Sequence, residues 1–86
     1  MTHGPPKGHG DKTYAGRLEG CEDLLAEVVE RVKPLAHIYG HIHEAYGWSQ
    51  SDLVDTLFIN AGTCNHGRPY KPCHKPIVFD LPCLEN

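Results

Sequence analysis

Residues 35–43 read LAHIYGHIH, an apolar-leaning run that predicts a β-strand with two histidines one residue apart at its end. Along a strand, His41 and His43 would point to the same side, with their α-carbons roughly 6.6 Å apart. Catalytic cation pairs sit about 3.5–4 Å apart, so the two imidazoles could each reach a different ion. The stretch therefore predicts a strand that ends in metal ligands, and two solvated histidines at a strand end are the alternative.

A second candidate ligand precedes a stiff turn in Thr2-His3-Gly4-Pro5-Pro6. Each proline fixes its own φ and pushes the preceding residue toward extended backbone. A rigid backbone suits a metal ligand, so His3 joins the candidate site. An ordinary surface turn is the alternative.

Five segments in register carry a resemblance to a known family. They are His3-Gly4-Pro5-Pro6, Gly20-Cys21-Glu22-Asp23-Leu24-Leu25, Gly40-His41-Ile42-His43-Glu44, Ile59-Asn60-Ala61 with Cys64, and Ile77-Val78-Phe79-Asp80-Leu81-Pro82. In order and spacing they resemble the calcineurin-like metallophosphoesterases. Within that superfamily, the chain is similar to the branch of metallophosphoesterase-domain-containing proteins, which resemble class III cyclic nucleotide phosphodiesterases.

The resemblance implies an α/β fold, the C-terminal half of a four-layered α/β/β/α sandwich. Residues 1–86 would supply most of one sheet and one covering helix. The family's Asp-x-His, Gly-Asp and Gly-Asn-His motifs do not occur in these residues, so the N-terminal half of the domain is expected to be absent. The last strand of this absent half would come just before His3. Residues 79–82 resemble the family's usual C-terminus.

The resemblance also implies the ligand set. His3 and His41 would bind one metal ion and His43 the other, while the aspartate and asparagine ligands and the histidine that contacts the scissile phosphate belong to the absent half. No catalytic residue is then expected in this chain, and its substrate-binding residues stay undefined. The complete domain would hold two divalent cations, with manganese expected and iron or zinc as alternatives, because nitrogen and carboxylate donors suit all three.

The implied activity is hydrolysis of a phosphoric ester, in particular a cyclic nucleotide or another small phosphodiester. Two cations in such sites activate a water molecule and stabilise charge during in-line attack on phosphorus. Three imidazoles cannot hold two dications without anionic oxygens, so the isolated chain is predicted to be inactive. Without its other half, the chain is also expected to self-associate or to pair with the missing part.

Two other classes of protein remain open. In one, His3, His41 and His43, with or without His9, hold a single Zn²⁺ or Ni²⁺ in a small module without catalysis. In the other, the chain is a truncated interaction or regulatory protein that pairs with a chain carrying the missing motifs.

The composition of the chain limits the classes of partner and the cell compartment that can be expected. The formal charge of −3 offers no basic stripe for a nucleic acid duplex. No apolar stretch approaches 18 residues and no signal peptide is visible, so the default expectation is a cytoplasmic protein without a membrane partner, and a longer natural N-terminus stays open. The four cysteines Cys21, Cys64, Cys73 and Cys83 are expected to be reduced thiols. Only a thin core is expected, because a chain of 86 residues buries about 60–65% of its unfolded surface.

The coarse order of elements is loop, helix and three strands. A loop is expected at 7–19, and apolar positions at helical spacing predict a helix over 21–33 that Pro34 ends, with Glu27 and Arg31 paired. Strands are expected at 35–43, 53–61 and 77–81, separated by turns at 44–52 and 62–76.

For several polar and aromatic residues outside the ligand set, the sequence predicts packing or solvation. His37 is expected to be packed or solvated, and His66 and His74 to be solvated. Asn60 is expected to satisfy backbone groups, with a role in orienting a group near the metals as the alternative, and Tyr46 and Trp48 either pack on their loop or stack on a base.

Overall fold

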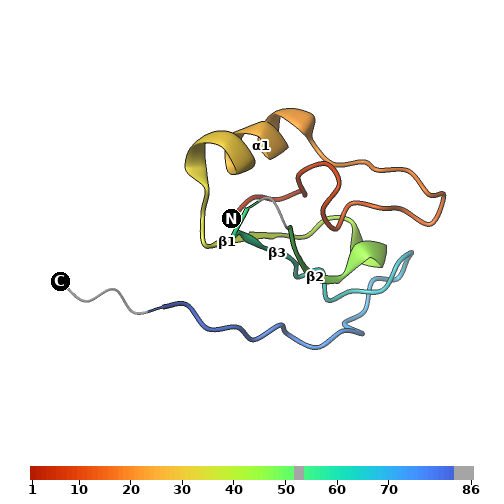
Figure 1. Ribbon diagram of the computed structural model, residues 1–86. Coiled ribbons are helices and arrows are strands. Elements are labelled where there is room, and N and C mark those ends of the chain that lie inside the picture. Colours follow the sequence, from red (N-terminus) through yellow and green to blue (C-terminus); the bar gives the residue numbers. More distant parts are fainter. Residues whose placement is uncertain (52–53, 83–86) are drawn as a thin grey trace.

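A computed structural model describes residues 1–51 and 54–82 of the chain, which form one helix over a three-stranded sheet (Figure 1). In chain order the elements are α1 (Glu22–Ala26), the π-helical turn η1 (Glu27–Val32), β1 (Ala36–Tyr39), the 3₁₀ turn η2 (His43–Ala45), β2 (Gly47–Gln50) and β3 (Leu57–Asn60). The fold is α/β, as predicted. Among the described residues, no helix is both long and apolar enough to cross a bilayer.

The sheet has the order β1-β3-β2 and is mixed. β3 runs parallel to β1, with Ile38 opposite Ile59, and antiparallel to β2, with Trp48 opposite Ile59. The first residues of the chain lie along the outer edge of β1, where the Thr2 N–H donates to Ile38 O at 3.0 Å and the Gly40 N–H donates to His3 O at 2.9 Å. These two bonds bring the His3 turn beside the end of β1.

The predicted helix over 21–33 is confirmed as a continuous helical segment made of α1 and η1. It begins after Cys21, whose sulfur accepts a hydrogen bond from the Leu24 N–H, and it ends at Lys33, which takes a left-handed φ of 46° just before Pro34. The expected ion pair between Glu27 and Arg31 is present on its exposed side. Its second half is π-helical, since the Lys33 N–H donates to Val28 O, five residues back.

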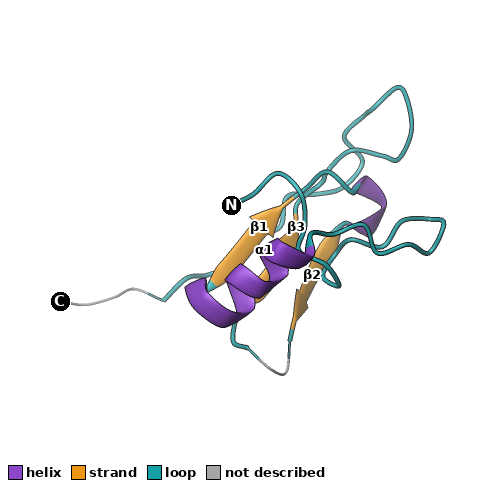
Figure 2. Ribbon diagram, turned by 90° about the horizontal axis from the view of Figure 1, so that it is seen from above, coloured by secondary structure: helices purple, strands orange, loops and turns teal. Residues whose placement is uncertain are grey.

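The core lies between this helix and one face of the sheet (Figure 2). Val28 from η1, Tyr39 from β1 and Phe58 from β3 are buried, and Leu24 and Val54 pack against them. Phe58 has no exposed surface at all. The expected thin core is confirmed, because few large apolar side chains are buried among the residues that the structure describes.

The strand predicted over 35–43 is too long. The observed strand ends before the two histidines, and this changes the geometry of the candidate site. β1 stops at Tyr39, and His41 adopts a positive φ of 69°. The Ile42 N–H donates to Gly40 O at 2.8 Å, which closes a tight turn around His41 of a rare, strained type. His41 and His43 are therefore not successive same-side residues of one strand.

The other strand predictions are partly wrong. Residues 77–81 are extended but pair with no strand, and they run beneath the sheet beside Trp48 and Leu57. The expected turn at 44–52 contains η2 and β2. The last three residues of β2 are all exposed, so its sequence lacks the alternation of apolar and polar residues by which a strand is recognised. Within 53–61 only Leu57–Asn60 form a strand, and Leu53 lies outside the described residues. The loop at 7–19 contains no regular strand or helix, as expected.

Candidate metal site

The turn that carries His3 and the turn that carries His41 meet at the end of β1. The His3 Nε2 and His41 Nδ1 atoms lie 3.1 Å apart, and the ring centroids are 4.8 Å apart. Two nitrogens on one ion with bonds of about 2.1 Å would be separated by about 3.0 Å in octahedral and about 3.4 Å in tetrahedral geometry. In the metal-free chain this contact is a hydrogen bond between the two imidazoles, and its length also equals the spacing of two adjacent ligands on a single cation. Both side chains are exposed to solvent.

His43 lies at the start of η2 and has a fixed ring orientation. Its Nδ1 atom is 3.0 Å from Asn65 O. A carbonyl oxygen can only accept, so Nδ1 carries the proton and Nε2 keeps its lone pair for a ligand. Histidines that bind metals characteristically have this second hydrogen bond.

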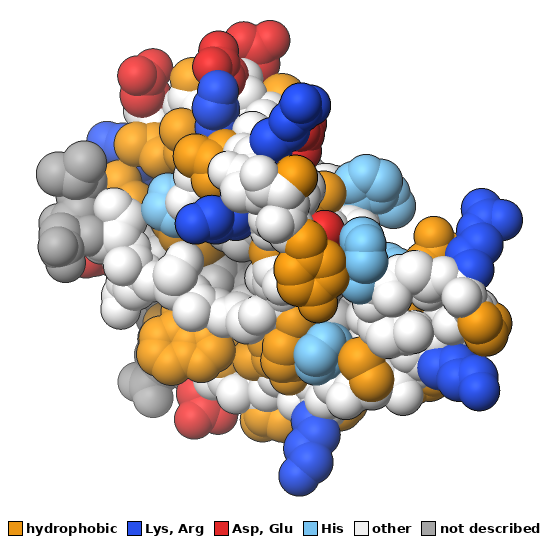
Figure 3. Space-filling view, turned by 90° about the vertical axis from the view of Figure 1, so that its right-hand side faces the viewer, with side chains coloured by type: hydrophobic (Ala, Val, Ile, Leu, Met, Phe, Trp, Pro, Cys, Tyr) orange, Lys and Arg blue, Asp and Glu red, His pale blue; other side chains and the backbone are white. Residues whose placement is uncertain are grey.

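His41 and His43 line the same cavity. It has a volume of about 460 Å³, and its walls are His41, His43, Glu44, His66, Gly67 and Tyr70. Figure 3 shows several exposed histidine side chains on this face of the molecule. Although the strand geometry was wrong, the two histidines still face one space.

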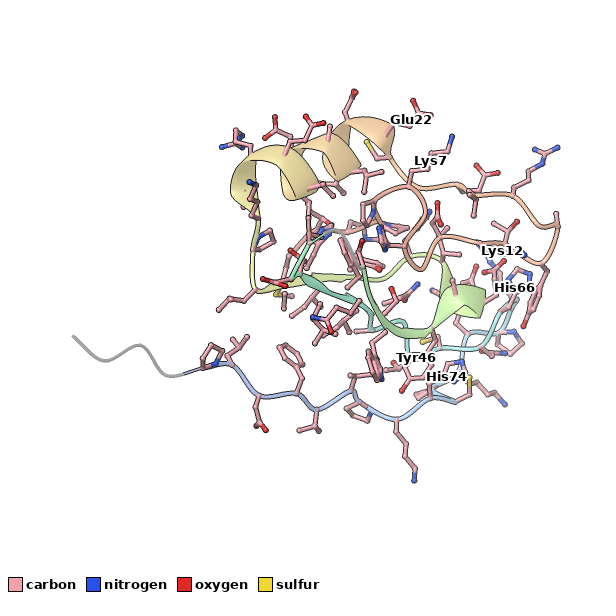
Figure 4. The ribbon with its side chains drawn as sticks, viewed as in Figure 1. Lys7, Lys12, Glu22, Tyr46, His66 and His74 are labelled. Atoms are coloured by element: carbon pink, nitrogen blue, oxygen red, sulfur yellow. The ribbon has the colours of Figure 1, made fainter. Side chains whose placement is uncertain are left out.

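Glu44 is the residue of this cavity that the sequence interpretation missed. Its carboxylate, about 9% exposed, lies 3.3 Å from His66 Nδ1 and accepts a hydrogen bond from the Tyr14 N–H at 3.4 Å. A hydrogen bond from its own backbone N–H, with those from Tyr14 and His66, lowers the pKa of Glu44. Through these contacts, the Glu44 carboxylate links η2 to the 7–19 loop and to the 62–76 segment. Figure 4 labels His66 on this side of the molecule.

The remaining histidines pack against rings. His9 stacks on Phe58 with centroids 3.8 Å apart, and His74 stacks on Tyr46 at 4.3 Å. The prediction that His74 is solvated is wrong, because this stacking leaves it half-buried. His66 is exposed, as expected, although it also contacts Glu44 and the edge of Tyr14. His37 is buried, which confirms that it is packed.

The residues that the structure describes contain no group of three His, Cys, Asp or Glu side chains placed to hold one ion. The single-ion alternative is therefore not assembled in these residues, and His9 does not add a ligand to it, because its ring stacks on Phe58. Cys21, Cys64 and Cys73 are free thiols, and Cys83 lies outside the described residues. The chain offers a pair of adjacent imidazoles and a third beside them, which fits part of a dinuclear ligand set.

The burial of histidines predicts that the chain loses stability as the pH falls below about 6.5. Burial lowers the pKa of His37, and positive charge at the N-terminal amine and at His9 lowers it further. Burial also lowers the pKa of His9, with Asp11 opposing. The unfolded chain takes up protons near pH 6.5 while the folded chain resists them, so this stability is complete above pH 6.5 and is lost toward the lower folded pKa values.

The measurement is the urea midpoint of unfolding at pH 7.5 and pH 5.5, a range that lies above the titration of carboxylates. The midpoint should be lower at pH 5.5, and His37→Phe should show a smaller difference between the two pH values. Equal midpoints for the parent chain would contradict the prediction.

Comparison with known proteins finds similar sequences over most of the chain. No family model matches it. It is 41% identical over its full length to human metallophosphoesterase domain-containing protein 1, of which it covers 26%. Two UPF0046 proteins of Caenorhabditis elegans are 44% and 43% identical over 95% of the chain, which covers 20% and 29% of them. The chain thus spans about a fifth to under a third of these relatives, and its sequence is similar to that of a metallophosphoesterase domain-containing protein, as the resemblance predicted.

Proposed function

We propose that this chain is one segment of a two-metal phosphoric ester hydrolase. His3 and His41 would hold one divalent cation, and His43 would hold the second through Nε2. The observation that carries the proposal is the 3.1 Å approach of the His3 and His41 nitrogens, which are 38 residues apart in sequence, beside a cavity that His43 also lines. The name of the human relative supports the same chemistry.

The bound cations would supply an activated water nucleophile and stabilise charge on the phosphoryl group. The chain's own residues would orient the ligands, since Asn65 O fixes the ring of His43 and the tight turn fixes His41. The substrate class we propose is a small phosphodiester, including cyclic nucleotides, and the ion is manganese. The acidic net charge argues against a nucleic acid duplex as substrate.

The anionic ligands would come from residues outside these 86. We propose that they stand in an upstream half of the same domain, which completes a four-layered α/β/β/α sandwich. On the face of the sheet opposite the helix, Trp48 is 66% exposed although residues 77–81 run beneath that face, and this exposed ring supports a further packing partner there. A separate chain that supplies those ligands is the second candidate, and the lack of a three-donor group in the described part is compatible with it.

The test is hydrolysis of bis-p-nitrophenyl phosphate with Mn²⁺. The purified 86-residue chain should show no turnover above that of free Mn²⁺, because three imidazoles cannot neutralise two dications. A longer protein that joins this segment to Asp-x-His, Gly-Asp and Gly-Asn-His motifs should show turnover. His41→Ala should then lower it by at least about 100-fold, since loss of a mere second-shell partner already costs 10–100-fold.

His74→Ala is the matched control, because His74 stacks on Tyr46 and does not line the cavity. It should retain turnover within about twofold. Metal-dependent turnover by the 86-residue chain, lost in its His41→Ala variant, would contradict the proposed division of ligands. Full activity of His41→Ala in the longer protein would overturn the metal assignment.

A further inference from the structure

We infer that His37 is a positioning residue for His3, which it holds in place through the hydroxyl group of Thr2. The inference deepens the proposed function and rests on it for the role of His3 as a ligand. It concerns a buried residue of β1 that lies outside the proposed ligand set. The evidence is a pair of hydrogen bonds that link His37 to Thr2 and Thr2 to Gly4, the two residues that flank His3.

The first link is the Thr2 hydroxyl. It donates to Gly4 O at 2.8 Å, and it lies 2.9 Å from His37 Nε2. A hydroxyl group has one proton, and a carbonyl oxygen can only accept. The bond to Gly4 uses that proton, so the contact with His37 must be a bond in which Nε2–H donates to the Thr2 oxygen.

This assignment determines the state of the His37 ring. In a neutral imidazole with its proton on Nε2, Nδ1 is a bare lone pair. His37 Nδ1 is buried and has no hydrogen-bond partner among the described residues. A second proton there would have no acceptor, so the fold selects the neutral Nε2–H form, the form that can donate to Thr2.

His37 is a rigid anchor for this bond. Its side chain is 4% exposed and packs beside Tyr39, at 5.0 Å between ring centroids, and beside Phe58, at 6.3 Å. Thr2, in contrast, is exposed. The bond therefore ties an exposed turn to the core.

The consequence falls on His3, which lies between the two residues that the hydroxyl joins. With Thr2 and Gly4 bridged, and with the Gly40 N–H bonded to His3 O, the backbone of His3 is held from both sides. This restraint keeps its ring beside His41. Without the hydroxyl, the turn would keep its backbone bonds to β1 but would lose its link to His37.

The test compares Thr2→Val, which keeps the shape but removes the hydroxyl, with Thr2→Ser, which keeps the hydroxyl. In the metal-free chain, ¹⁵N spectra should show His37 protonated at Nε2 and bare at Nδ1. Thr2→Val should speed amide exchange at Gly40 by about tenfold and lower the affinity for added Ni²⁺ by about tenfold, in the range seen for lost outer-shell partners. Thr2→Ser should stay within about twofold of the parent on both measures.

A parent His37 protonated at Nδ1, or a Thr2→Val chain with parental exchange and parental Ni²⁺ affinity, would overturn the inference. The spectra and the exchange measurements need no metal and no substrate. They therefore test the bond between Thr2 and His37 and its restraint on His3 even if the chain binds no Ni²⁺. Failure of phosphodiester hydrolysis in the longer protein would instead count against the proposed function alone. Because Thr2 is exposed, its substitution removes no side chain of the buried core.

Discussion

Replacing Phe58 with alanine is expected to unfold the chain. Phe58 is completely buried in β3, shares the core with Val28 and Tyr39, and carries the stacked ring of His9 on one face. Phe→Ala substitutions in cores cost about 3–5 kcal/mol. Small domains have total stabilities of only about 5–15 kcal/mol, and this thin core places the chain near the lower end.

Far-ultraviolet circular dichroism during urea titration measures the effect. The Phe58→Ala chain should show little cooperative transition at 25 °C, while Phe58→Leu should retain part of the parental midpoint. Val78→Ala is the matched control, because Val78 is 91% exposed and its truncation should change the free energy of unfolding by less than about 0.5 kcal/mol. A parental midpoint for Phe58→Ala would mean that β3 does not pack as described.

The second large effect is expected at Asn60, the last residue of β3. Its side chain has no exposed surface and makes three hydrogen bonds, since Nδ2 donates to Gly10 O and to Ile42 O, both at 2.9 Å, while Oδ1 accepts from the Gly62 N–H at 3.0 Å. Asn60→Ala would leave these backbone groups without partners. Each unsatisfied buried group costs about 1–3 kcal/mol, so a loss of about 3 kcal/mol is expected.

The loss should be visible as a lower urea midpoint and as faster amide exchange at Gly62. Asn65→Ala is the matched control, because the Asn65 side chain accepts one bond from the Lys71 N–H in an exposed hairpin and should cost less than about 1 kcal/mol. Asn60→Asp should be as harmful as Asn60→Ala, since it places a carboxylate oxygen against two carbonyl oxygens. Equal midpoints for the Asn60 and Asn65 variants would contradict this account.

Asn60 also shows what local sequence can predict about the site. Its role in satisfying backbone groups was expected at a strand end, and the structure confirms it. Its two carbonyl partners, however, come from residues 50 and 18 positions away in the chain. No pattern within a strand identifies such partners, because they depend on which loops meet there.

The strands were harder to predict than the helix for a related reason. The 21–33 helix has an apolar stripe and a proline at its end, which are local signals. Strand ends depend on pairing with distant segments. β1 stops at Tyr39 because a tight turn follows, and residues 77–81 form no ladder with a neighbouring strand.

The sequence by itself determined the helix, the α/β class and the relationship to metallophosphoesterase domain-containing proteins, because these depend on local periodicity and on the order of residues. Only the tertiary structure decided that His3 lies against His41, that Glu44 contacts His66 and that His37 bonds to Thr2. The physical reason is that each of these contacts joins residues 22 to 38 positions apart. Their distance and their burial are set by how the helix, the sheet and the loops pack together.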